Sequence, residues 1–192
     1  MKKLIAFTLI LFSSISSINA EEIKRIFVGN KDAKITIIAY ESLTCSHCAN
    51  FHKDVYPELK EEYLDTGLAK IEFRHFPLDI AAFNAAKISQ CKNDGDSVIL
   101  NSLYFNQQKW VKGTSVGDAN ENMKKFLISE NFDLDFEKCI NNKEIEEFVL
   151  NDRIDGVKKF KVNSTPTIII NNKKFEKTLN YKNLKKALKK LI

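Results

Sequence analysis

The pattern of hydrophobic residues predicts a strand, a helix and a second strand in the first part of the chain. Residues 33–40 form a β-branched, mostly apolar run that is typical of a buried strand, and residues 68–76 alternate between apolar and polar positions. Between them, residues 45–63 follow a helical spacing. The apolar face of this helix carries Cys48, His52, Val55 and Leu59. We therefore expect a βαβ unit whose helix is bent near Pro57.

The rest of the chain is first helical and then mixed. Helical periodicity dominates residues 78–156, and no strand pattern interrupts it. The apolar run 167–170, the turn Asn171-Asn172 and residues 173–177 then predict a β-hairpin. Residues 181–192 predict a final helix that covers the sheet. Its apolar stripe consists of Leu184, Leu188, Leu191 and Ile192.

The first twenty residues have the pattern of a cleaved secretory signal peptide. Lys2 and Lys3 precede a short apolar run, and a small residue, Ala20, ends the segment. The apolar run is shorter than the ~20 residues that a membrane-spanning helix needs. We therefore expect an exported, periplasmic protein, in a compartment where disulfides form and persist.

These segments predict four parts. Residues 1–20 are the signal peptide, residues 21–77 and 157–192 form an α/β core, and residues 78–156 form an inserted helical domain. The sequence contains no flexible linker rich in Gly, Pro or Ser between them. We therefore expect the helical block to pack on the core.

The composition is that of a soluble globular protein. The 192 residues are 44% hydrophobic and 29% charged, which excludes the disordered and fibrous classes. The formal net charge is +5, but the charges are spread along the chain, and removal of Lys2 and Lys3 lowers it by two. We therefore expect no nucleic-acid partner.

Two of the four cysteines lie close together, in the sequence Cys45-Ser46-His47-Cys48, where the first strand gives way to the helix. A cysteine at a helix N-terminus faces unsatisfied backbone N–H groups and the positive end of the helix dipole, which stabilise its thiolate. We therefore expect Cys45 to be the nucleophile and the more buried Cys48 to be the resolving thiol. His47 is expected to favour the thiolate further, and a dithiol that is stabilised in its reduced form is an oxidant.

Other interpretations of this pair fit the sequence less well. A c-type haem site needs a histidine directly after the second cysteine, where this chain has Ala49. A zinc site needs two further ligands at a workable spacing, and Cys91 and Cys139 are isolated. A purely structural disulfide across four residues would constrain the unfolded chain little. We therefore expect redox chemistry with neither a metal nor another cofactor.

The sequence resembles the DsbA-like branch of the thioredoxin-fold disulfide oxidoreductases. The resemblance rests on residues 39–52, on Tyr56-Pro57-Glu58-Leu59 and on residues 73–79. It implies an α/β thioredoxin fold with an inserted helical domain and a catalytic pair at Cys45 and Cys48. It also implies a cis-proline at Pro166, and a cis peptide there would let the Thr165 backbone approach a bound chain.

Two positions depart from the family pattern. Relatives commonly have an acidic residue where this chain has Ala39, but Glu41 lies two residues further on the same side of the strand. Glu41 can therefore supply the same buried carboxylate and move protons near Cys48, unless it is an ordinary solvated residue. The second departure is Thr165, where many DsbA proteins have valine and the isomerases have threonine. It leaves the choice between oxidase and isomerase open.

Cys91 and Cys139 both lie in the helical block. If they are bonded, the chain-entropy model gives an upper figure of roughly 4 kcal/mol for the stabilisation from the loop that they close. Some relatives are similar in having a non-catalytic disulfide in this region. Two unpaired buried thiols are the alternative.

The leading hypothesis is a monomeric, exported thiol:disulfide oxidase that acts on reduced exported proteins. The resemblance implies a quinone-linked, DsbB-like membrane protein as the partner that reoxidises the cysteine pair. The alternatives are a disulfide isomerase or reductase of the same fold, and a non-enzymatic role such as a thiolate Cu(I) carrier or a peptide-binding chaperone.

Overall fold

A mixed sheet of five strands lies between two layers of helices. The computed structural model describes residues 22–192, so the expected signal peptide lies outside the described residues. The strands are β1 (Phe27–Gly29), β2 (Ile35–Glu41), β3 (Ala69–His75), β4 (Thr167–Ile170) and β5 (Lys173–Lys174). Their order in the sheet is β1-β3-β2-β4-β5, with β2 and β3 parallel and the other neighbours antiparallel.

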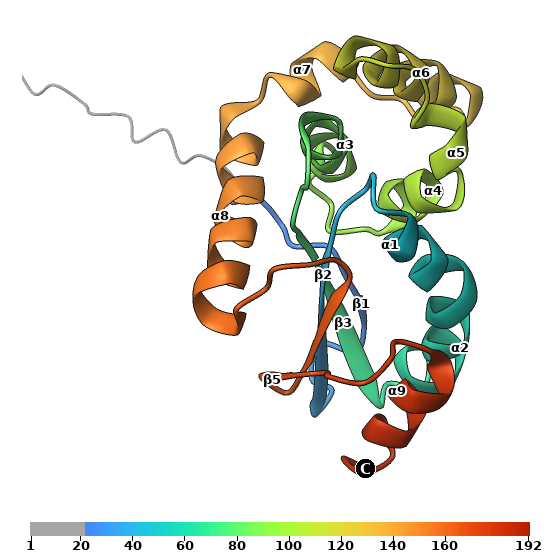
Figure 1. Cartoon of the computed structure of the whole chain (residues 1–192), viewed down its shortest axis with the longest axis vertical. Coiled ribbons are helices and arrows are strands. Elements are labelled where there is room, and N and C mark those ends of the chain that lie inside the picture. Colours follow the sequence, from blue (N-terminus) through green and yellow to red (C-terminus); the bar gives the residue numbers. More distant parts are fainter. Residues whose placement is uncertain (1–21) are drawn as a thin grey trace, which may run out of the picture.

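The helices fall into three groups (Figure 1). They are α1 (Ser46–Asn50), α2 (Tyr56–Leu59), α3 (Ile80–Gln90), α4 (Val98–Phe105), α5 (Gln107–Trp110), α6 (Val116–Ser129), α7 (Phe136–Ile140), α8 (Lys143–Phe160) and α9 (Tyr181–Leu188). Helices α1, α2 and α9 cover one face of the sheet, and α8 covers the other. Helices α3 to α7 gather beyond one end of the sheet. This is the thioredoxin fold with inserted helices that the resemblance implies.

The central strand β2 is buried on both faces, which explains its nearly continuous apolar sequence. Ile35, Ile37 and Ala39 pack in the larger core beneath α1, α2 and α9. Ile38 and Tyr40 pack on the opposite face, in a smaller cluster that reaches Phe160 of α8. Helix α8 approaches this face so closely that a Cβ atom at Gly156 would lie 2.8 Å from a ring carbon of Tyr40.

The helical segment after the cysteine pair is continuous from Ser46 to Leu64 but irregular. Turns of π-helix at Phe51–Val55 and Lys60–Leu64 interrupt the α-helical hydrogen-bonding pattern. The first of these turns directly precedes α2, which has Pro57 in its first turn. A π-helical turn thus lies directly before the proline, which lacks the N–H group that a regular helix would use there; the bend predicted near Pro57 stays a prediction.

The sequence predictions for the sheet are confirmed at the centre and need correction at the edges. Strands β2, β3 and β4 lie where expected, within two residues. Strand β1 was not predicted, because its three residues are too few for a periodic pattern, and its pairing with β3 defines it. The hairpin turn is present, with positive φ angles at Asn171 and Asn172, but β5 contains only two residues instead of the expected 173–177.

The C-terminal helix is also shorter than expected. Leu184 and Leu188 are buried as predicted, but α9 ends at Leu188, and Leu191 and Ile192 are exposed. The predicted boundary between residues 156 and 157 falls inside α8. Of the residues that the structure describes, none belongs to a helix long and apolar enough to cross a bilayer.

Candidate active site

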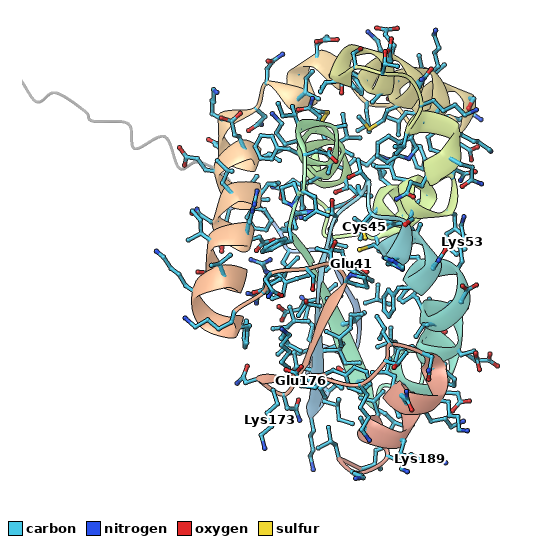
Figure 2. All side chains as sticks on the ribbon, viewed as in Figure 1. Glu41, Cys45, Lys53, Lys173, Glu176 and Lys189 are labelled. Carbon is cyan, nitrogen blue, oxygen red and sulfur yellow. A yellow bond between two sulfur atoms is a disulfide. The ribbon has the colours of Figure 1, made fainter. Side chains whose placement is uncertain are left out.

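Cys45 lies where β2 gives way to α1. It is the N-cap residue of α1, with an extended backbone conformation (φ −76°, ψ 119°), and its N–H group donates to the carbonyl oxygen of Ser42. The side-chain amide of Gln107 holds this turn by donating to the carbonyl oxygens of Leu43 (2.8 Å) and Cys45 (3.0 Å). Figure 2 shows Cys45 near Glu41 at the beginning of α1. The fold thus places the cysteine at a helix N-terminus, as the sequence predicts.

The two thiols of the pair lie in different environments. Both are reduced, Cys45 is partly exposed, and Cys48 is completely buried. A hydrogen bond from the Cys48 thiol, together with the backbone N–H groups of Cys48 and His47, lowers the pKa of Cys45 to about 5. Burial, with smaller effects from the Cys45 sulfur and the Glu41 charge, raises the pKa of the Cys48 thiol far above its ordinary value. At neutral pH the pair therefore holds one thiolate, at Cys45, and one thiol.

The loop before β4 forms the other side of the site. The Thr165–Pro166 peptide bond is cis, as the resemblance implies. The carbonyl oxygen of Thr165 lies 3.4 Å from Sγ of Cys45, although the two residues are 120 positions apart in the sequence. The side chain of Thr167 holds the loop by donating to the carbonyl oxygen of Ser164. The reactive sulfur therefore lies between a helix N-terminus and this loop.

Glu41 is buried and paired with a histidine. Its Oε2 atom lies 2.8 Å from Nε2 of His52, and both side chains are almost inaccessible to solvent. Nδ1 of His52 lies 3.0 Å from Oδ1 of Asn101 in α4, and the ring stacks on Tyr104 with centroids 4.0 Å apart. The charge of Glu41 raises the pKa of Cys48, which places the carboxylate within electrostatic reach of the buried thiol. The solvated alternative for Glu41 is therefore wrong.

The second carboxylate oxygen of Glu41 is available to exchange a proton. Oε1 is buried and has no hydrogen-bond partner in the described structure. Nδ1 of His52 faces the acceptor Oδ1 of Asn101 and therefore carries a proton, so the hydrogen bond between Nε2 and Oε2 requires a second proton, on either atom. The pair is thus a buried store for a proton close to Cys48.

The pattern of the sequence places His52 on the apolar face but gives no chemical role to it. A histidine at this position needs buried polar partners, because an unpaired imidazole in a core is costly. The only sequence feature that could have indicated a partner for His52 is Glu41, eleven residues earlier. The hydrogen bond between His52 and Asn101 depends on how α4 packs, which the sequence pattern does not specify.

His47 occupies a different position from His52. Its side chain is exposed, and its backbone N–H group contributes to the low pKa of Cys45. The imidazole lines a cavity of about 580 Å³ next to the cysteine pair. The other walls come from residues of the same helix, from Thr165 and Pro166, and from residues 178–181 at the start of α9.

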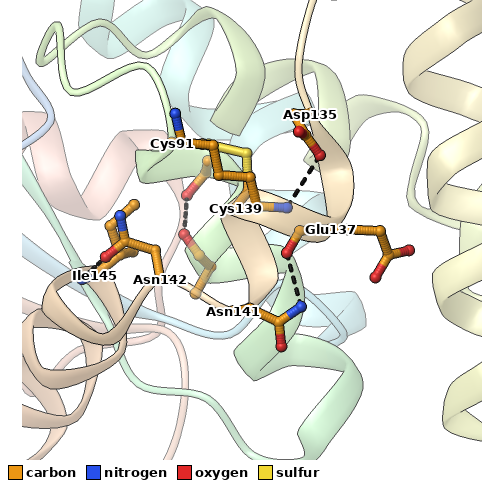
Figure 3. Close-up of a disulfide and its surroundings, with 10 residues drawn as sticks. Cys91, Asp135, Glu137, Cys139, Asn141, Asn142 and Ile145 are labelled. Atoms are coloured by element: carbon orange, nitrogen blue, oxygen red, sulfur yellow. Dashed lines mark hydrogen bonds between the residues drawn. A yellow bond between two sulfur atoms is a disulfide. The ribbon is translucent and has the colours of Figure 1, made fainter.

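The other two cysteines are bonded to each other, which confirms the predicted structural disulfide (Figure 3). Cys91 directly follows α3, and Cys139 lies in α7. Asp135 caps α7 by accepting a hydrogen bond from the N–H group of Lys138 (3.0 Å). The bond therefore joins two of the inserted helices. In residues 22–192, no three His, Cys, Asp or Glu side chains are grouped so that they could hold a metal ion.

Comparison with known proteins agrees with this geometry. The family model described as thioredoxin matches residues 21–190. The chain belongs to the thioredoxin family. The crystal structure of Wolbachia pipientis alpha-DsbA1 superposes with a TM-score of 0.78 and 30% identity, over 87% of this chain and 90% of that one. The DsbA resemblance seen in the sequence is confirmed.

Curated relatives of the chain carry names related to disulfide chemistry. A putative protein-disulfide oxidoreductase of Rickettsia bellii is 29% identical over 152 residues, which are 75% of this chain and 56% of that protein. Disulfide bond formation protein D of Bacillus subtilis is 23% identical over 175 residues, which are 85% of this chain and 75% of that protein. The chain thus spans little more than half the length of the rickettsial relatives.

Proposed function

We propose that the protein is an exported thiol:disulfide oxidoreductase that introduces disulfide bonds into secreted or periplasmic proteins. The observation that carries the proposal is that the two thiols have pKa values shifted in opposite directions. The pKa of Cys45 is lowered to about 5, and the pKa of Cys48 is raised. A stable thiolate at Cys45 favours the reduced form of the pair. A pair whose reduced form is favoured oxidises other dithiols.

The reaction begins with the oxidised pair. A substrate thiolate attacks Sγ of Cys45, the bond between Cys45 and Cys48 breaks, and its electron pair leaves on Sγ of Cys48. The second substrate thiolate then attacks the substrate sulfur of the mixed disulfide and releases the electron pair onto Cys45. Two electrons pass from the substrate to the enzyme. The substrate leaves with a disulfide and the enzyme with a dithiol.

Each cysteine suits its part in this scheme. Cys45 is the more accessible sulfur and a good leaving group, because its thiolate is stable at neutral pH. Cys48 is closed to solvent, so the leaving thiolate needs a proton from a buried group. Glu41 and His52 hold such a proton, and Glu41 can take it back when Cys48 attacks during reoxidation. His52 acts through Glu41 and is a positioning residue.

The loop at Thr165 and Pro166 is proposed to bind the substrate backbone. It faces Cys45 across the site and borders the cavity beside the pair. Reduced exported proteins are the proposed substrates, with a DsbB-like membrane protein as the reoxidising partner. The expected export through residues 1–20, the periplasmic location and the monomeric state belong to this proposal.

The test is the oxidation of a reduced, unfolded protein that contains two cysteines. Stoichiometric oxidised enzyme should form one substrate disulfide per enzyme disulfide consumed, and Cys45→Ser should abolish the reaction. A parallel assay with a scrambled disulfide substrate separates isomerisation from oxidation. The proposal fails if the enzyme rearranges scrambled disulfides efficiently but does not oxidise the dithiol substrate.

A further inference from the structure

The cavity beside Cys45 has acidic walls. Asp54 and Glu58 line it, and no lysine or arginine does. They lie four positions apart in the helical segment that follows the cysteine pair, and both side chains are exposed. In the part of the chain that the structure describes, neither carboxylate has a hydrogen bond or an ion pair with another side chain. Two carboxylates thus line the cavity, and no lysine or arginine shares its walls; His47 does, and Lys185, which lies within electrostatic reach of Glu58, pairs with Glu62 (2.6 Å).

This local charge is opposite to the charge of the whole chain, which has 30 lysines and arginines and 25 acidic residues. The neighbouring cation, Lys53, donates instead to Gln108 (3.3 Å) and lies on the outer side of the helix (Figure 2). Two like charges about one helical turn apart repel each other. A cation brought into the cavity would relieve this repulsion.

The remaining walls of the cavity suit the stem of a long side chain. Phe51, Val55, Pro166 and Leu179 provide apolar surface, and Tyr181 borders them. Lysine and arginine side chains combine an apolar stem with a charged end, so the stem can pack on this surface while the charge reaches a carboxylate. A purely apolar side chain would fit the surface but leave the carboxylates unpaired.

The positions of the carboxylates define where such a side chain would lie in a substrate. At the ~1.5 Å per residue of a regular α-helix, Asp54 and Glu58 are at most about 14 and 20 Å along the helix from Cys45, because the π-helical turn at Phe51–Val55 rises less per residue. An extended chain covers ~3.3 Å per residue, so these distances correspond to about four and six substrate residues.

We propose that this cavity selects reduced substrates that carry a lysine or arginine about four to six residues from the cysteine that attacks Cys45. The selection rests on the proposed function, because only a protein that exchanges disulfides through Cys45 has a substrate chain there. Charge complementarity at such a site acts mainly on the rate of productive encounter and on the choice between substrates.

The experiment uses three synthetic dithiol peptides that differ at one position, five residues from the attacked cysteine. This position carries lysine, glutamine or glutamate. The second-order rate constant for oxidation by the oxidised protein should be about three- to tenfold higher for the lysine peptide than for the glutamate peptide. The ratio should shrink towards one in 1 M salt, where the Debye length is ~3 Å. In the double variant Asp54→Asn, Glu58→Gln the ratio should also fall to about one.

The matched control is Glu144→Gln with Glu147→Gln, which changes the net charge equally at two exposed positions of α8, on the opposite face of the sheet. This variant should keep the wild-type ratio. Equal rates for the lysine and glutamate peptides in the wild-type protein would overturn the proposal, as would an equal loss of preference in the control. If none of the three peptides is oxidised, the proposed function itself has failed.

Discussion

The two cysteine pairs of this protein consist of the same side chains but differ in state. One pair is reduced, and the other forms a disulfide. Cys45 and Cys48 are three positions apart, reduced, and held at the junction of β2 and α1. Cys91 and Cys139 are 48 positions apart and bonded, between two inserted helices. A disulfide in the first pair would close a loop too short to stabilise the fold, whereas the disulfide of the second pair closes a long one. The comparison shows that position in the fold, rather than the presence of two cysteines, decides which pair can react.

The environment of each pair explains this division. Backbone N–H groups and the Cys48 thiol stabilise the Cys45 thiolate, and the Thr165 carbonyl oxygen lies 3.4 Å from its sulfur. Around the second pair, the polar groups serve as helix caps, such as Asp135. The two sulfur atoms of this pair are bonded to each other, so neither is available as a thiolate.

The largest predicted effect is on the first pair. In Cys48→Ala, oxidative turnover should disappear, because the enzyme can no longer form its own disulfide. After incubation with oxidised glutathione the variant should retain one glutathione per chain, bound to Cys45, whereas the wild-type protein releases it when Cys48 attacks. Mass spectrometry measures the adduct. A variant that stays unmodified would contradict the assignment of the nucleophile to Cys45.

The next prediction concerns the second pair. The variant Cys91→Ala, Cys139→Ala should lose roughly 4 kcal/mol of unfolding free energy, because the long loop is no longer closed. Denaturant unfolding measures this loss. In conditions where the variant is folded, the pKa of Cys45 should stay near 5. A pKa of Cys45 that moves away from about 5 in the folded variant would show that the two pairs are coupled. The separate roles assigned to the two pairs would then be wrong.

A third prediction separates proton transfer from thiolate stability in the first pair. In Glu41→Gln, the step in which Cys48 attacks the Cys45–glutathione mixed disulfide should slow by about a hundredfold at neutral pH, because the nearby base is lost. Burial is the main cause of the raised Cys48 pKa, so the thiol stays protonated in the variant. Its rate should then rise about tenfold per pH unit.

Stopped-flow kinetics measure this pH profile. The surface variant Glu144→Gln should keep the wild-type profile. In His52→Asn the same step should slow less than in Glu41→Gln, because the carboxylate remains. An unchanged profile in Glu41→Gln would exclude the carboxylate from proton transfer.

The smallest predicted effect concerns His47. Because its imidazole is exposed, its interaction with the Cys45 thiolate is screened by solvent. His47→Ala should therefore lower the oxidising equilibrium constant against glutathione by only about two- to fivefold. Added salt should reduce the difference between the variant and the wild-type protein. A much larger effect would mean that the side chain, rather than the helix N-terminus, controls Cys45.

Local patterns in the sequence were sufficient to place the reactive pair. A buried strand, two cysteines and a helix follow one another within about 20 residues, so the N-cap position of Cys45 depends only on neighbouring residues. The same locality explains why β2 and β3 were predicted well, whereas β1, with three residues, was not.

The rest of the site depends on contacts that the sequence does not specify. The Thr165 carbonyl reaches Cys45 across 120 positions, and Asn101 reaches His52 only because α4 packs on the helix after the cysteine pair. The bond between Cys91 and Cys139 was one of two alternatives until the packing of α3 and α7 was known. Resemblance to a family supplied the expectation of a cis bond at Pro166, which periodicity alone could not provide.

The most direct test of the account is the titration of the Cys45 thiolate by its ultraviolet absorbance in the reduced protein. The account predicts a single transition with a midpoint near pH 5, which is absent in Cys45→Ser and present in Cys91→Ala, Cys139→Ala. Cys48 should add no second transition at neutral pH, because its pKa is raised. A midpoint near the ordinary cysteine value of 9.0, or a thiolate that persists in Cys45→Ser, would contradict the account.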